Sequence, residues 1–138
     1  FVAEKYGVKY YDDSISTTPG SAIAALKAFV EPKILILGGS DKGADYSELA
    51  KEIARQNVRL IIINGANADE IREVLRGEKI DCEIVQLNMA GMKEVAKLAK
   101  NKAQSGDVVI LSPAAASFDM FKSYSDRGEQ FVAAVEEL

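Results

Sequence analysis

Short apolar runs recur along the chain at intervals, and helix-forming segments separate them. Four of the runs are rich in Ile, Leu and Val: residues 33–37, 58–63, 82–87 and 107–111. Residues 34–37 and 60–63 leave no polar face. Continuous apolar runs of about four to eight residues are typical of strands that helices cover on both sides. A shorter strand is expected over residues 9–12. The pattern therefore predicts about five strands in a largely buried sheet.

Amphipathic helices are predicted in the gaps between these runs. Thr18 followed by Pro19 is a typical helix start, with a capping hydroxyl and a first-turn proline. Asp45 with Glu48, and Asn67 with Glu70, have the spacing of capping boxes. Two more helices are expected from apolar stripes near residues 92–99 and 131–138.

Strand and helix alternate along the whole sequence. This alternation predicts an α/β fold, a Rossmann-like three-layer domain with a mainly parallel sheet of about five or six strands and helices on both faces. Because no linker or low-complexity segment interrupts it, residues 1–138 are expected to form one domain.

The composition excludes several kinds of catalytic and metal-binding site. The chain has 17 basic and 21 acidic residues, a net charge of −4, no histidine and one cysteine. Catalysis by Ser-His-Asp or Cys-His and any histidine metal site are therefore excluded within these residues. Without a basic run, binding to nucleic acid or to an anionic membrane is not expected. We expect a cytoplasmic, monomeric domain, and the start at Phe1 rather than Met suggests one module of a longer protein.

Ligands of open α/β sheets bind beyond the carboxyl ends of the strands, which directs attention to the loops there. The loop at residues 38–43 has three glycines and a single cation, Lys42. It matches neither the dinucleotide fingerprint nor the phosphate-binding P-loop. Lys42 is thus either a point charge for an anionic ligand or a solvated residue in a plain connection.

Two further loops carry hydroxyl groups. Residues 13–18 include Asp13 and Thr17, which could bind ribose or carboxylate oxygens or could serve only to cap the next helix. Residues 112–119 are small apart from Phe118 and Asp119, and offer the hydroxyl of Ser117. Small residues at the end of a strand let a ligand come close, although they also suit a simple helix cap.

Together these loops resemble the C-terminal domain of the Mur ligases, in particular of the member that adds D-glutamate. The matching segments are YDDSISTTPGS at 11–21, ILGGSDKG at 36–43 and SPAAASFDMFKSYSDRGEQF at 112–131. The resemblance covers nearly the whole chain, and the third segment is the most specific because it is the longest.

The resemblance implies an ATP-dependent amide ligase of peptidoglycan precursor synthesis. Such a ligase converts UDP-N-acetylmuramoyl-L-alanine into an acyl phosphate that D-glutamate attacks. Lys42, Thr17, Ser117 and the backbone around Tyr124 would bind D-glutamate, and Asp13 would contact the ribose of ATP. The ligands of Mg²⁺ and the phosphate-binding loop would belong to N-terminal and central domains outside this chain, so the chain alone is expected to be inactive.

Three positions depart from the resemblance: Ile15 replaces a frequent lysine, Thr18 a frequent asparagine and Tyr124 a frequent phenylalanine. Two alternatives stay open. One is the C-terminal domain of another Mur ligase or of a folylpolyglutamate synthetase. The other is a Rossmann-like binding module without a catalytic role.

Overall fold

A single sheet runs through the centre of the computed structural model, which describes residues 1–40 and 43–138. Within those residues the strands lie in the order β1-β2-β6-β3-β4-β5, and all are parallel except β1, which pairs antiparallel with β2. The strands are β1 (Ala3–Lys5), β2 (Val8–Asp12), β3 (Lys33–Leu37), β4 (Val58–Ile63), β5 (Glu83–Gln86) and β6 (Val108–Leu111).

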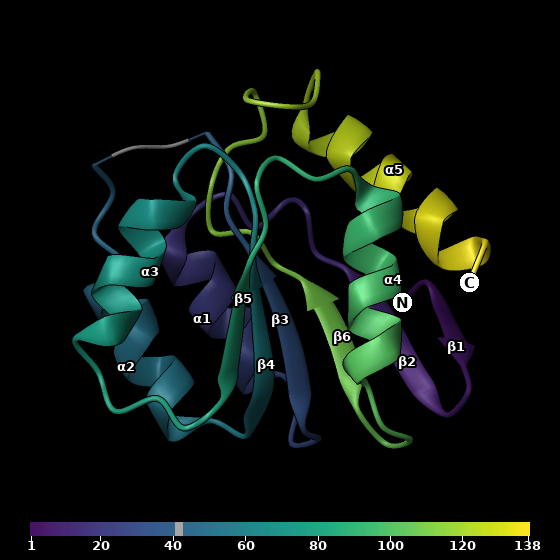
Figure 1. The fold of residues 1–138 in the computed structure, drawn as a ribbon, viewed down its shortest axis with the longest axis horizontal. Coiled ribbons are helices and arrows are strands. Elements are labelled where there is room, and N and C mark those ends of the chain that lie inside the picture. Colours follow the sequence, from purple (N-terminus) through teal and green to yellow (C-terminus); the bar gives the residue numbers. More distant parts are fainter. Residues whose placement is uncertain (41–42) are drawn as a thin grey trace.

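Helices cover the sheet on both faces, as the alternation predicts (Figure 1). They are α1 (Pro19–Lys27), α2 (Ser47–Arg55), α3 (Ala68–Arg76), α4 (Met92–Lys102) and α5 (Tyr124–Glu136). On β3, Ile34 and Ile36 pack toward α4 and α5, whereas Leu35 and Leu37 pack toward α1, α2 and α3. Successive side chains of a strand point to opposite faces, so a continuous apolar run supplies both halves of the core. The predicted three-layer α/β fold is confirmed.

The sequence pattern placed β3 and β4 at their observed bounds but missed or shifted other strands. Strand β1 was not predicted, because Ala3–Lys5 has no apolar pattern and is held by its pairing with β2. The strand predicted over 82–87 is shorter, covering Glu83–Gln86. Cys82 precedes it and is half-buried, and burial raises the pKa of its thiol.

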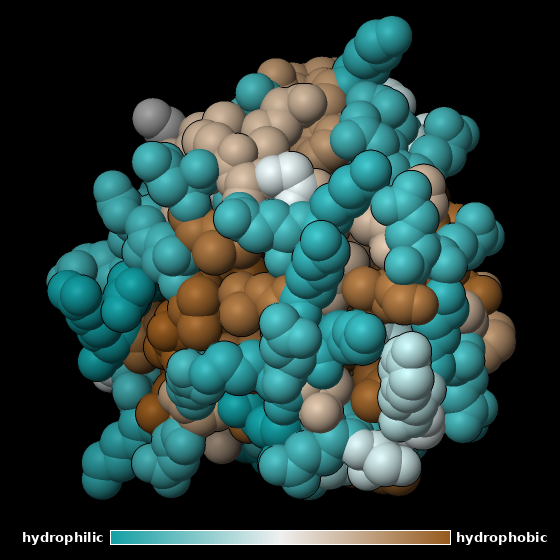
Figure 2. All heavy atoms as spheres, turned by 45° about the vertical axis from the view of Figure 1, so that its right-hand side comes forward, coloured by the Kyte–Doolittle hydropathy of each residue, from teal (hydrophilic) through white to brown (hydrophobic). Residues whose placement is uncertain are grey.

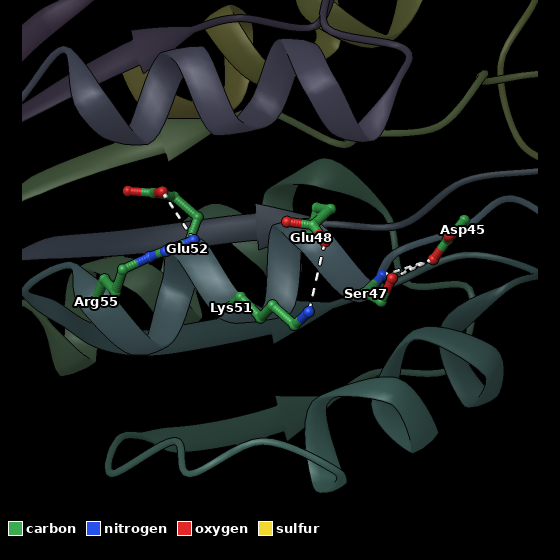
Figure 3. Close-up of polar contacts among 6 residues, drawn as sticks. All are labelled: Asp45, Ser47, Glu48, Lys51, Glu52 and Arg55. Atoms are coloured by element: carbon green, nitrogen blue, oxygen red, sulfur yellow. Dashed lines mark hydrogen bonds and ion pairs between the residues drawn. The ribbon is translucent and has the colours of Figure 1, made fainter.

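Two of the three predicted helix caps are wrong. The hydroxyl of Thr18 does accept the N–H of Ser21, as predicted. At α2, however, the carboxylate of Asp45 binds the N–H and hydroxyl of Ser47, while Glu48 points toward Lys51 (Figure 3). The N-cap residue is Tyr46, whose own side chain makes no capping hydrogen bond. The helix therefore starts one residue later than the capping-box spacing indicates.

The surface is mostly hydrophilic on the side shown in Figure 2, with a hydrophobic area reaching the surface between polar side chains. Large exposed apolar side chains include Ile15 and Phe118, both in loops at the carboxyl ends of the strands. Among the helices of the described residues, none has the length and apolar character needed to cross a bilayer.

Candidate functional site

The carboxyl ends of β6 and β3 form the point where the chain leaves the sheet in opposite directions. From β6 it continues to α5, which packs on one face, and from β3 to α2, which packs on the other. In open α/β sheets, neighbouring strands whose connections diverge in this way leave a crevice that binds ligands. The topology thus places the candidate site above β3 and β6, at the top of Figure 1.

The loop after β6 holds the site together through its backbone. Its Pro113 carbonyl accepts the N–H of Gly38 at 2.9 Å, and its Ala116 carbonyl accepts the N–H of Ser40 at 2.9 Å. On its other side, the N–H of Ala114 donates to the carbonyl of Ser16 at 2.9 Å. The three loops singled out in the sequence are therefore connected, with residues 112–117 in the middle.

Glycine is required where the loop after β3 meets its neighbours. Gly38 has a φ of +111°, and a Cβ there would lie 1.9 Å from the carbonyl oxygen of Asn64. A Cβ on Gly39 would lie 2.1 Å from the carbonyl oxygen of Ala116. No side chain fits at these distances, so the close approach of the loops depends on both glycines.

Both flanks of the segment that contains Lys42 are fixed to α3. The N–H of Gly39 donates to Oδ1 of Asn67 at 2.9 Å, and the N–H of Gly43 donates to Oε1 of Glu70 at 2.8 Å. Asn67 and Glu70 thus bind Gly39 and Gly43 of the loop after β3, called the glycine loop below (residues 38–43). They do not form the predicted capping box. Lys42, the predicted cation of the site, lies outside the described residues.

The buried Arg127 links two of the site loops and was not recognised as a site residue from the sequence. Its guanidinium donates to the hydroxyl and carbonyl of Ser14, both at 2.8 Å, and to the carbonyl of Ala115 at 2.9 Å. The Ser14 hydroxyl in turn donates to the carbonyl of Tyr124 at 2.7 Å. A signal was present, because Arg127 and Gly128 belong to the long third motif.

The described residues predicted to bind D-glutamate lie on these connected loops. Ser117 is buried, and its hydroxyl has no hydrogen-bond partner within the described residues. Thr17 is half-buried just before α1, and Tyr124 is the first residue of α5 with an exposed ring. The structure brings together the backbone of all three loops. Binding of an amino acid by these residues remains a prediction.

Asp13, predicted to contact ribose, is held by two serines. Its Oδ2 accepts hydrogen bonds from the hydroxyls of Ser16 and Ser112. A carboxylate has about four acceptor positions, so Oδ1 can still accept a hydroxyl from a ligand. The residue lines a hollow of about 520 Å³, together with Tyr11 and Phe29. Ile15, where a lysine is frequent, lines a separate groove of about 490 Å³ against α5.

The fold and the position of the site define a class: a Rossmann-like α/β domain whose candidate site lies at a topological switch point. Residues 1–115 match the family described as "Mur ligase, glutamate ligase domain". The chain belongs to this family.

Curated relatives are similar over the whole chain. All three of the following carry the name UDP-N-acetylmuramoylalanine--D-glutamate ligase: proteins from Pseudomonas fluorescens (45% identical), Pelotomaculum thermopropionicum (41%) and Clostridium perfringens (39%). Each comparison covers 100% of this chain, and the chain spans 30% of the length of each relative.

Proposed function

We propose that this chain is the amino-acid-binding domain of an ATP-dependent ligase that joins D-glutamate to UDP-N-acetylmuramoyl-L-alanine. Membership of the family and the names of relatives that match the whole chain support this assignment. The observation that carries it is the junction of the three loops, near which the buried hydroxyl of Ser117 has no hydrogen-bond partner among the described residues.

The chemistry of the loops suits D-glutamate, which has two carboxylates and one amine. Lys42 would supply a positive charge to one carboxylate, and the hydroxyls of Thr17 and Ser117 would donate hydrogen bonds. A hydrogen bond to a charged group contributes about 1.5–3 kcal/mol, or one to two powers of ten in affinity. The connected loops would hold the amine toward the reacting centre.

In the proposed reaction, ATP transfers its γ-phosphoryl group to the substrate carboxylate and gives an acyl phosphate. The amine of D-glutamate then attacks the acyl carbon, and inorganic phosphate leaves as the amide forms. This chain would hold the amino acid and, through Asp13, the ribose of ATP. The described residues contain no group of three Asp, Glu, Cys or His that could hold a metal ion. On the resemblance to the Mur ligases, we assign the Mg²⁺ ligands to the rest of a cytoplasmic ligase, and expect this chain alone not to hydrolyse ATP.

The test replaces Lys42 in the complete ligase and measures steady-state kinetics for each substrate. Lys42→Ala should raise the KM for D-glutamate by about tenfold to a hundredfold, because one charge-assisted contact is lost. The KM for ATP should stay within about twofold.

A matched control is Lys79→Ala, which removes an exposed lysine that follows α3 at the opposite edge of the sheet. It should leave both constants unchanged. An equal rise in both KM values for Lys42→Ala would contradict the assigned role, and absence of amide product from the unmodified ligase with D-glutamate would refute the function itself.

A further inference from the structure

The carboxylate of Asp119 joins the loop after β6 to the loop after β4. Its Oδ2 accepts the N–H of Ala66 at 3.0 Å, from a residue 53 positions earlier in the chain. Its other oxygen, Oδ1, is buried and has no hydrogen-bond partner within the described residues. Within the part of the chain that the structure describes, Asp119 therefore accepts one hydrogen bond from a distant segment, through one of its two oxygens.

Gly65 makes this contact possible. It has a φ of +118°, and a Cβ there would lie 2.9 Å from Oδ2 of Asp119 and 2.7 Å from the backbone nitrogen of Gly39. The three segments that follow β3, β4 and β6 thus meet at one glycine. A side chain at this position would push Asp119 away from the glycine loop.

The contact also fixes the turn that carries Ser117. The carbonyl of Ser117 accepts the N–H of Met120 at 3.3 Å and of Phe121 at 2.9 Å, so that Asp119 lies inside a closed turn. Just before this turn, the carbonyl of Ala116 binds the N–H of Ser40. Ser117 is consequently held between two attachments, one to the loop after β3 and one to the loop after β4.

We propose that Asp119 is a positioning residue of the amino-acid site. It holds the turn carrying Ser117 against the glycine loop and does not touch the substrate. The inference rests on the proposed function. The position of one acceptor oxygen of Asp119 should therefore matter for binding of D-glutamate, whereas the negative charge of this carboxylate should not.

Two substitutions in the complete ligase separate geometry from charge. Asp119→Asn keeps an acceptor in the place of Oδ2, and its NH₂ group replaces an oxygen that has no partner, so the KM for D-glutamate should stay within about twofold of the unmodified value. Asp119→Glu keeps the charge but moves the acceptor by one methylene group. It should raise this KM by about tenfold, with little change in the KM for ATP.

Asp119→Ala should raise the KM for D-glutamate as Asp119→Glu does. The matched control is Asp81→Ala, which removes an exposed aspartate that precedes β5. The inference is overturned if Asp119→Asn raises the KM for D-glutamate as much as Asp119→Ala does, since the charge of Asp119 would then be required. It is equally overturned if no variant changes the KM for D-glutamate, or if both KM values rise together.

Hydrogen exchange of the Ala66 amide in the 138-residue chain tests the contact without any substrate. Exchange should be faster in Asp119→Ala and unchanged in Asp119→Asn, and equal exchange in all variants would overturn the inference. A ligase that makes no amide from D-glutamate would refute the proposed function, while the Ala66 measurement would still decide whether the contact exists.

Discussion

Replacing Arg127 by methionine should lower the stability of this chain more than almost any other single substitution. The guanidinium is 2% exposed and joins α5 to the loops after β2 and β6. Methionine restores the packing of the aliphatic stem of arginine, but it has no guanidinium group and cannot donate a hydrogen bond. The substitution therefore removes mainly the polar contribution.

The magnitude follows from the groups that lose their donor. The carbonyls of Ser14 and Ala115 each lose a hydrogen bond from a charged group, as does the Ser14 hydroxyl. A buried carbonyl left without a partner costs about 1–3 kcal/mol. Allowing for the regained packing, we expect the free energy of unfolding to fall by about 3–5 kcal/mol, against a total of about 5–15 kcal/mol for a domain.

Urea unfolding of the 138-residue chain, followed by circular dichroism, measures this change directly. The melting temperature should fall by about 10–15 °C. The control is Arg76→Met, because the Arg76 side chain is 64% exposed and forms an ion pair with Glu73 at 3.5 Å. It should change the free energy by less than about 0.5 kcal/mol. A loss below about 1 kcal/mol for Arg127→Met would refute the view that this residue connects the site loops.

Two further predictions concern the site glycine and a buried phenol. Gly39→Ala should destabilise the chain by about 2–3 kcal/mol in urea unfolding, because the new methyl group meets the Ala116 carbonyl. The control is Gly20→Ala, whose methyl group meets nothing within 4 Å, and it should be neutral or stabilising. Burial raises the pKa of the Tyr10 phenol, so the unfolded chain loses this proton first and stability should fall as the pH rises above about 10. When the free energy of unfolding is measured between about pH 8 and pH 11, Tyr10→Phe should reduce its fall at high pH, whereas Tyr6→Phe, at an exposed position, should not. Equal pH dependence in both variants would contradict the assignment of this effect to Tyr10.

The sequence predicted the sheet well where side chains alone determine the structure. β3 and β4 have the expected bounds because runs of Ile and Leu can be buried only inside a covered sheet. β1 could not be predicted, since its three residues gain their conformation from pairing with β2. Likewise, Asn67 fits the local rule for a helix cap, but its side chain binds Gly39 and Tyr46, which are 28 and 21 residues away.

The same distinction applies to the site. The three loops could be predicted because the carboxyl ends of parallel strands lie at one edge of the sheet. The partners of Arg127 could not, because Ser14 is 113 residues away and arginine is rarely buried. Likewise, the residues next to Asp119 in the sequence do not indicate its hydrogen bond with Ala66. Local patterns indicate which loops take part, whereas the contacts between loops depend on the finished fold.

The central position of β6 has a consequence for the newly made chain. Of the six strands described, β6 is the last to leave the ribosome, yet it lies between β2 and β3 and pairs with both. Until it emerges, the hairpin of β1 and β2 has no strand that joins it to β3, β4 and β5. Residues 112–117, which connect the three site loops, follow β6 directly. A partly translated chain would thus lack both the complete sheet and the connected loops of the candidate site, and the two would arise together.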